Sequence, residues 1–316
     1  MGSVDEGMRI RAGLGEKVSL FELSLSRKVF ARGRQLSGVV LLRLARPVNV
    51  KAIMISVSGA EFVSGAKLTG SLRSGNSFFR REVVLSGRDR PRLISERLSQ
   101  YWNAFLKRER YRKLSAGEHT YPFTVTLPAS LPPTCEGRAG RIAYFVVARV
   151  KFPLGRAFQV TTEVPVAFSA GDTPEEPFSM SHSSVYSGMH ATGADMRVDL
   201  PNRSFDLGSS VTGKLTIMNP RRAHMGNITV SLDVCDGARM GSRGGVLEKS
   251  IQAVTIVPDD PTAEEITGDF HLSIPSDAPV SVEGRSVLVT WSLGVSVEAR
   301  PPLDLRVPVI VRLPAG

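Results

Sequence analysis

The chain has 316 residues, of which 42% are hydrophobic and 22% charged, and its formal net charge is +10. This composition excludes a wholly disordered chain and a fibrous repeat, and the length favours two domains. The positive charge suits an acidic partner, such as a phosphorylated protein, nucleic acid or anionic lipid. No apolar run reaches the roughly 18 to 20 residues that span a bilayer, and residues 1–17 lack the apolar core of a signal peptide, so we expect a cytoplasmic protein.

Short apolar segments with alternating polarity, bounded by Gly, Pro, Asn and Asp, recur along the chain and predict β-strands. In chain order, the expected strands are 18–25, 39–44, 52–57, 121–127, 142–152, 158–168, 211–218, 228–234, 247–257, 270–274, 287–297 and 303–313. One further stretch has helical periodicity. The pattern predicts an all-β protein made of β-sandwiches.

The chain resembles itself at two fixed offsets, which indicates an internal duplication. Residues 30–53 match residues 205–228 at an offset of 175 positions. Residues 123–144 match residues 270–291 at an offset of 147, through prolines, a Glu-Gly-Arg triplet and an aromatic residue. We therefore expect two sandwiches of one topology, the first with 28 extra residues between its third and fourth matching strands.

The second matching segment has a simple physical meaning. Pro128 and Pro275 end a strand because proline cannot donate to the hydrogen-bond ladder. The glycines allow tight turns, and the next strand begins with an aromatic residue, Tyr144 or Trp291, that we expect to point inward.

Two stretches of the first half resemble arrestin domains. Residues 30–40 read Phe-Ala-Arg-Gly-Arg-Gln-Leu-Ser-Gly-Val-Val and are similar to the PGxxVxGxVxL opening of arrestin-type domains, with Ala31-Arg32 where a proline is common. Residues 117–144 resemble the later segment GxxxxPFxFxLPxxLPxSxxGxIxY. The resemblance covers about residues 16–168, and the second half resembles an arrestin C-domain mainly through the duplication.

The resemblance implies two tandem immunoglobulin-like sandwiches joined by a short linker, and a non-enzymatic adaptor that docks on membrane-protein cargo. We expect a flexible N-terminus at 1–15, an N-domain at 16–168, a linker at 169–196 and a C-domain at 197–316. The double prolines at 132–133 and 301–302 are not followed by Tyr as in PPxY, so recruitment of a ubiquitin ligase by that motif is unsupported. The chain therefore resembles the minimal arrestin-like core of retromer's arrestin-fold subunit or of bacterial sporulation-control proteins more than it resembles a receptor-desensitising arrestin.

The extra residues of the first half form a basic segment. Residues 88–113 hold nine basic and three acidic residues, and their apolar residues recur at spacings of three and four, which predicts a short amphipathic helix. The apolar side can pack on the sheet with its charges solvated, or the helix can bind acidic lipid or phosphorylated cargo. The candidate residues for an acidic partner or lipid are Arg97, Lys107, Arg108, Arg110, Arg112 and Lys113.

The sequence motifs that could indicate a nucleotide, metal or catalytic site are weak. Residues 208–214 read Gly-Ser-Ser-Val-Thr-Gly-Lys, but Leu215 replaces the magnesium-binding Ser or Thr and the segment predicts a strand, so we expect no nucleotide site. Cys135 and Cys235 lack CxxC spacing, and the five histidines lack metal-site spacing. No catalytic set stands out, and we expect no enzyme, metal or cofactor.

We therefore expect an adaptor or scaffold in trafficking or signalling that binds cargo at sheet edges and concave faces, in the cytoplasm or peripherally at endosomal or plasma membranes. Candidate contacts for phosphate or acidic groups are Lys17, Arg27, Lys28, Arg32 and Arg34, unless these form a solvated strand face. The alternative is a structural coat-complex subunit of the retromer type. A basic membrane-binding or nucleic-acid-binding protein is less favoured, because the chain lacks a recognition motif and has only 7% aromatic residues.

Overall fold

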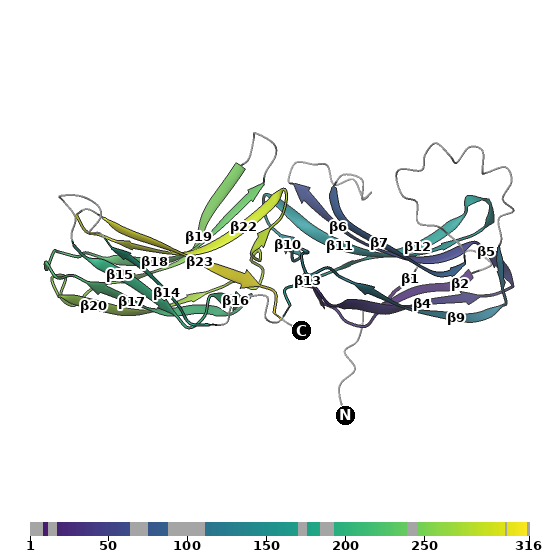
Figure 1. Cartoon of the computed structure of the whole chain (residues 1–316), viewed down its shortest axis with the longest axis horizontal. Helices are drawn as coiled ribbons and strands as arrows, with labels where there is room; N and C mark the ends of the chain where they lie inside the picture. The colour runs from purple at the N-terminus through teal and green to yellow at the C-terminus, as the bar shows by residue number, and fades with distance from the viewer. Residues whose placement is uncertain are drawn as a thin grey trace, which may run out of the picture.

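The computed structural model describes residues 9–11, 18–63, 75–87, 111–169, 176–183, 193–238, 245–300 and 302–314. Two β-sandwiches lie end to end along the long axis of the molecule (Figure 1). Each of the predicted strands is present, which confirms the predicted all-β fold class. Within the described ranges, no helix is long and apolar enough to cross a membrane.

The first sandwich packs two main sheets against each other. One sheet has the strand order β1-β2-β4-β9, and the other has the order β10-β11-β6-β7 with β12 also paired to β11. The strands are β1 (Arg9–Arg11), β2 (Val18–Leu25), β4 (Gln35–Leu44), β6 (Ala52–Val63), β7 (Asn76–Gly87), β9 (Gly117–Thr126), β10 (Cys135–Glu136), β11 (Gly140–Lys151) and β12 (Ala157–Val164). Two small pairs complete it, formed by β3 (Phe30–Ala31) with β13 (Val166–Ala167) and β5 (Val48–Val50) with β8 (Arg112–Leu114).

The second sandwich repeats this plan. Its sheets have the orders β14-β15-β17-β20 and β16-β23-β22-β18-β19, with β21 paired to β22. The strands are β14 (Phe178–Ser183), β15 (Asp195–Leu200), β16 (Ser204–Asp206), β17 (Ser210–Met218), β18 (Ile228–Ala238), β19 (Gly245–Ile256), β20 (Glu265–Ser273), β21 (Val282–Glu283), β22 (Val287–Val297) and β23 (Leu303–Arg312). β14 lies inside the range expected as a linker and pairs with β15.

Two features differ from the sequence prediction. The long strand β7 and the strands β14 and β15 were not predicted. The predicted helix lies outside the described residues up to position 110, but Arg112 and Lys113, which the prediction placed in it, belong to β8 and pair with β5. The helical assignment is wrong for these two residues, because their backbone continues a β-ladder through Val48–Val50.

The duplication is visible in individual hydrogen bonds. The hydroxyl of Tyr144 donates to the carbonyl of Pro132 at 2.5 Å, and the indole N–H of Trp291 donates to the carbonyl of Pro279 at 2.9 Å. Both aromatic side chains are at most 1% exposed, so each brings its single polar atom to a partner inside the core. The two aromatic positions and the two prolines are related by the offset of 147 that the sequence predicted.

The paired glycines Gly38 and Gly213 are required by close packing. A Cβ atom on Gly38 would lie 2.4 Å from the carbonyl oxygen of Ser24 and 2.9 Å from the ring of Phe123. A Cβ atom on Gly213 would lie 2.6 Å from the ring of Phe270. The glycine-lysine pair at 213–214 therefore lies inside β17 and belongs to the sheet.

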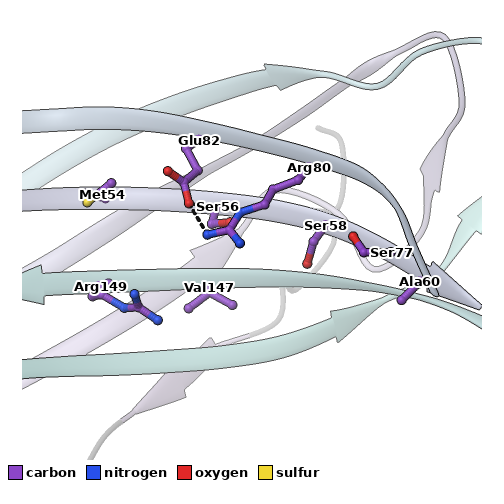
Figure 2. Close-up of a pocket in the computed structure, with 9 residues that line it drawn as sticks. All are labelled: Met54, Ser56, Ser58, Ala60, Ser77, Arg80, Glu82, Val147 and Arg149. Carbon is purple, nitrogen blue, oxygen red and sulfur yellow. Dashed lines mark hydrogen bonds and ion pairs between the residues drawn. The ribbon is translucent and has the colours of Figure 1, made fainter. Parts of the chain in front are cut away.

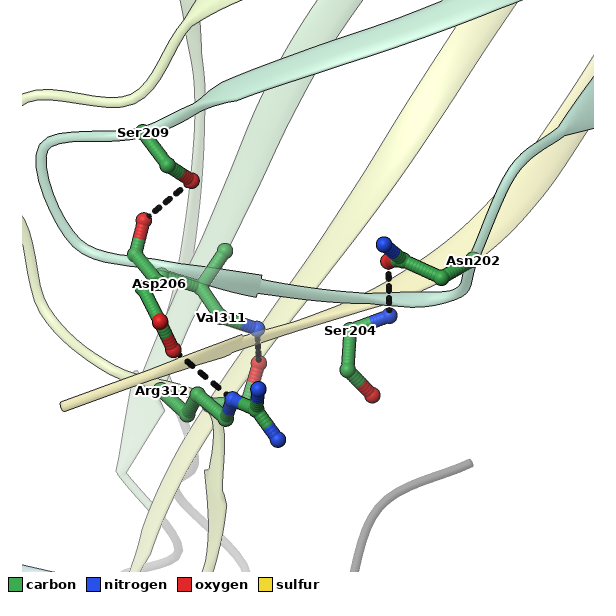
Figure 3. A network of polar contacts seen from close by, with 7 residues as sticks. Asn202, Ser204, Asp206, Ser209, Val311 and Arg312 are labelled. Atoms are coloured by element: carbon green, nitrogen blue, oxygen red, sulfur yellow. Dashed lines mark hydrogen bonds and ion pairs between the residues drawn. The ribbon is translucent and has the colours of Figure 1, made fainter. Parts of the chain in front are cut away.

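One polar network distinguishes the second sandwich (Figure 3). Asp206 and Arg312 stand opposite each other in the parallel pair β16–β23, and the Arg312 Nε–H donates to Asp206 Oδ1 at 2.7 Å. The equivalent pair β3–β13 of the first sandwich has Ala31 opposite Ala167. The same backbone pairing is thus supported by an ion pair in one copy and by small side chains in the other.

The two sandwiches meet through reciprocal polar contacts. Glu61 on β6 accepts hydrogen bonds from the backbone N–H groups of Arg285, at 2.8 Å, and Ser286, at 2.5 Å, in the second sandwich. Asp236 on β18 accepts hydrogen bonds from the backbone N–H groups of Arg138 and Ala139 in the first sandwich. Both carboxylates are buried, and these N–H groups compensate their loss of water.

Candidate functional site

Three surfaces of the first sandwich carry the side chains that could bind a partner. The first is a hollow of about 190 Å³ on the outer face of the sheet formed by β7, β6 and β11 (Figure 2). Alternate residues of β6 form its floor because successive side chains of a strand point to opposite faces. The lining residues are Met54, Ser56, Ser58, Ala60, Ser77, Arg80, Glu82, Val147 and Arg149.

Small side chains make this surface concave. Serine and alanine at positions 56, 58 and 60 leave space where larger residues would fill the face. Arg80 donates from Nε to Glu82 Oε1 at 3.0 Å, and Arg149 donates from Nη2 to the neutral Gln159 Oε1 at 2.8 Å. The hollow therefore combines a floor of small residues with hydrogen-bonding groups at its rim, a combination that suits an extended polypeptide.

The second surface holds four of the predicted phosphate contacts. Arg27 and Lys28 lie in the turn after β2, and Arg32 and Arg34 lie in the turn between β3 and β4. Arg27, Lys28 and Arg34 are exposed. These turns lie at the end of the first sandwich that faces the second, close to β13 (Figure 1). The structure thus places the four residues near one another.

Arg32 differs from the other three because its side chain is partly buried. Its guanidinium lies 4.5 Å from the ring centroid of Phe168, and Nη1 donates to the carbonyl of Leu131 at 3.2 Å. Its backbone N–H donates to Ala167. Cation–π stacking and these bonds give Arg32 a structural role in closing this end of the sandwich.

The third surface lies at the opposite, outer end of the first sandwich, beyond β5 in Figure 1. A hollow of about 590 Å³ opens there between three loops. Its lining includes Arg46 and Lys113 from two neighbouring segments, and Arg156 with Leu154 from the turn between β11 and β12. The structure therefore places the predicted residue Lys113 beside two basic residues that the sequence analysis did not select.

Arg112 points toward a different neighbour. Its Nη1 donates to the hydroxyl of Ser86 on β7 at 3.0 Å. The Arg112 charge also acts on Tyr121, whose pKa is nevertheless raised because burial outweighs that charge. Five other predicted residues, Lys17, Arg97, Lys107, Arg108 and Arg110, lie outside the described residues. Their role stays a prediction.

Arg46 and Arg156 could not be selected from local sequence patterns because neither has an adjacent basic residue in the sequence. Their relationship comes from the topology, which brings 45–51, 111–117 and 151–157 to one end of the sandwich. In the described part of the chain, no three His, Cys, Asp or Glu side chains gather where they could hold a metal ion.

Comparison with known proteins finds an arrestin match over the first sandwich. Residues 20–167 match the family described as Arrestin (or S-antigen), N-terminal domain. Human arrestin domain-containing protein 1 is 32% identical over 139 residues, which cover 43% of this chain and 27% of that protein. A Schizosaccharomyces pombe protein named as an arrestin-related trafficking adapter is 26% identical over 137 residues, covering 37% of this chain and 20% of its own.

A third relative comes from Emericella nidulans. The HECT-type ubiquitin ligase-interacting protein apyA is 28% identical over 180 residues, which cover 56% of this chain and 44% of that protein. The chain therefore spans less than half the length of each of these relatives.

Proposed function

We propose that this chain, an arrestin-like protein whose residues 20–167 belong to the arrestin N-terminal domain family, is a non-enzymatic adaptor that binds membrane-protein cargo. The observation that carries the proposal is the family match over the first sandwich, together with a relative named as a trafficking adapter. In this proposal, the protein acts at the cytoplasmic face of endosomal or plasma membranes.

The hollow over β6 supports a peptide-binding role. Its neighbour β7 is the last strand in the order of its sheet and is 12 residues long, so its outer edge can accept an added strand. A cargo segment that pairs with β7 would lie beside Arg80 and Glu82 at the rim of the hollow. The main chain of β7 would then provide affinity and the rim side chains specificity.

Affinity purification of the full chain followed by mass spectrometry tests the proposal. An adaptor should capture several membrane proteins below stoichiometric amounts. The alternative function, a structural coat-complex subunit of the retromer type, predicts one soluble partner at a stoichiometric ratio. Recovery of neither class from membrane-containing extracts would contradict both functions.

A pair of substitutions tests the hollow itself. Ser56→Arg with Ser58→Arg would fill the floor with two long side chains, and we expect captured cargo to decrease at least about tenfold, since interface centres tolerate such bulk poorly. Ser250→Arg with Ser276→Arg, at exposed positions of the second sandwich, is the matched control. Equal capture by both variants would place cargo binding elsewhere.

A further inference from the structure

Three described segments at the outer end of the first sandwich hold basic residues as their only charged residues. The three loops that meet there, 45–51, 111–117 and 151–157, contain basic residues and neither Asp nor Glu. The basic residues are Arg46, Lys51, Arg112, Lys113, Lys151 and Arg156. These 21 positions together hold a charge of +6, although they come from three separate segments between positions 45 and 157 of the sequence.

The apolar side chain of Leu154 projects from this basic surface. Leu154 is 94% exposed and, in the described part of the chain, exceeds every other large hydrophobic side chain in exposure. Its φ of 60° lies in the left-handed region, which is uncommon for a residue other than glycine. The backbone N–H of Phe152 donates to the carbonyl of Arg156 at 2.8 Å and closes the turn that holds Leu154 outward.

Two aromatic rings pack at the base of this turn. The rings of Phe152 and Phe158 meet edge to face with centroids 5.6 Å apart, and Phe152 is buried. Arg46, Lys113 and Arg156 are all exposed around the hollow that these rings help to line. An apolar tip is thus held on a packed base and surrounded by cationic groups.

We propose that this outer end docks on the surface of an anionic lipid membrane. Arg46, Lys113 and Arg156 contact lipid phosphate and carboxylate groups, and Leu154 enters the boundary between headgroups and acyl chains. Charge complementarity favours an anionic surface. The protruding leucine favours a lipid over a phosphopeptide or nucleic acid, because the acyl chains of a membrane form a continuous hydrocarbon layer that an isolated apolar side chain can enter.

This inference goes beyond the proposed function, since docking on lipid requires no cargo. It also predicts an orientation. The outer end lies at one extremity of the long axis and the junction with the second sandwich lies at the other end of this domain (Figure 1). Docking through the outer end therefore leaves Arg27, Lys28 and Arg34, near the junction, away from the lipid.

The test is sedimentation of the full chain with phosphatidylcholine vesicles that contain or lack phosphatidylserine. We expect binding that requires phosphatidylserine and weakens with added salt. The triple variant Arg46→Gln, Lys113→Gln, Arg156→Gln should bind about 100-fold more weakly, since each basic residue near an anionic surface contributes about a factor of five.

A matched control uses the other end of the same sandwich. The triple variant Arg27→Gln, Lys28→Gln, Arg34→Gln removes the same residue types and the same charge from exposed positions. We expect it to retain vesicle binding within about twofold. Equal weakening of the two triple variants would mean that net charge alone drives binding and would overturn the proposal, as would the lack of wild-type binding at low salt.

A second measurement tests whether residue 154 inserts into the membrane. Leu154→Trp should show a blue-shifted emission on phosphatidylserine vesicles and quenching by brominated acyl chains, while Leu154→Ser should bind about fivefold more weakly than wild type. Emission that stays unchanged on vesicles would exclude insertion. If the outer triple variant lost binding to a phosphopeptide or to DNA but kept binding to vesicles, the surface would belong to that other partner. Circular dichroism confirms that each variant is folded.

Discussion

Glu61 and Asp236 occupy equivalent positions in the two sandwiches, and each accepts backbone hydrogen bonds from the opposite sandwich. The two positions differ by 175, the offset of the first matching block. Each carboxylate accepts from the backbone N–H of the arginine of one Glu-Gly-Arg triplet, at 136–138 or 283–285, and from the N–H of the residue after it. The junction therefore uses one contact twice, in opposite directions, as a symmetric dimer interface does.

Loss of either carboxylate should weaken the junction. In Glu61→Gln, the amide oxygen can accept one of the two N–H groups, but the amide nitrogen faces the other and leaves it unpaired. We expect a loss of about 1 to 3 kcal/mol in the free energy of unfolding, measured by guanidinium denaturation, and a similar loss for Asp236→Asn. The double variant should also have a larger radius of gyration in small-angle scattering.

An exposed glutamate provides the comparison for these variants. Glu118 forms an ion pair with Arg43 at 2.7 Å, and its side chain is 47% exposed. Glu118→Gln should cost no more than about 1 kcal/mol because surface ion pairs contribute little. If Glu61→Gln were as mild as this control and left the radius of gyration unchanged, the carboxylate would have no role in holding the two sandwiches together.

The glycine of each Glu-Gly-Arg triplet should contribute to stability, because a larger residue would collide with the carboxylate that the glycine faces. A Cβ atom on Gly137 would lie 2.7 Å from Asp236 Oδ2, and one on Gly284 would lie 2.7 Å from Glu61 Oε1. We expect Gly137→Ala to lower the free energy of unfolding by about 1 to 3 kcal/mol. In an Asp236→Ala background the same substitution should cost less, because the colliding group is absent. Strictly additive losses in this double-mutant cycle would contradict the explanation.

The sequence predicted the sandwich architecture because the duplicated residues have local signals. Proline ends strands, and Tyr144 and Trp291 follow at a fixed spacing. The offset of 175 also pairs Glu61 with Asp236, but a buried carboxylate in an apolar strand gives no sign of its partner. That partner is a turn more than 200 residues away in the case of Glu61. Contacts between the sandwiches depend on how the two copies are arranged, and periodicity carries no information about that arrangement.

Strand β7 escaped prediction for a different reason. Arg80, Arg81 and Glu82 are consecutive in its middle, and they interrupt the alternation that marks a strand with one buried face. The pairing with β6 also shifts register twice, which disturbs the period of two. Charged residues are common on edge strands because they oppose aggregation. The run of charged residues that prevented the prediction of β7 is therefore expected of a strand at the edge of a sheet.

Arg32 should behave as a structural residue and Arg34 as a surface residue. Arg32→Gln removes the stacking on Phe168 and the Nη1 bond to Leu131, and we expect a loss of about 1 kcal/mol in the free energy of unfolding. Arg34→Gln, at an exposed position in the same turn, should stay within about 0.5 kcal/mol of wild type. Thermal denaturation of both variants tests this, and equal melting temperatures would contradict a structural role for Arg32.

Cys135 makes the junction sensitive to alkaline pH. Its Sγ lies 3.4 Å from the carbonyl oxygen of Val280 in the second sandwich. Burial, together with the negative charge of Asp236, raises the pKa of the Cys135 thiol from 9.0 to about 12. Below pH 9 the thiol is protonated in both the folded and the unfolded chain. Between pH 9 and 12 only the unfolded chain loses this proton, so the free energy of unfolding decreases as the pH rises.

Replacing Cys135 should therefore flatten the alkaline dependence of stability. Cys135→Ser keeps a donor toward Val280 but does not ionise in this range, so its free energy of unfolding should decrease less steeply than that of wild type between pH 9 and 12. Denaturation series at several pH values measure the two slopes. Identical slopes for wild type and Cys135→Ser would mean that the thiol ionises as readily in the folded chain as in the unfolded one.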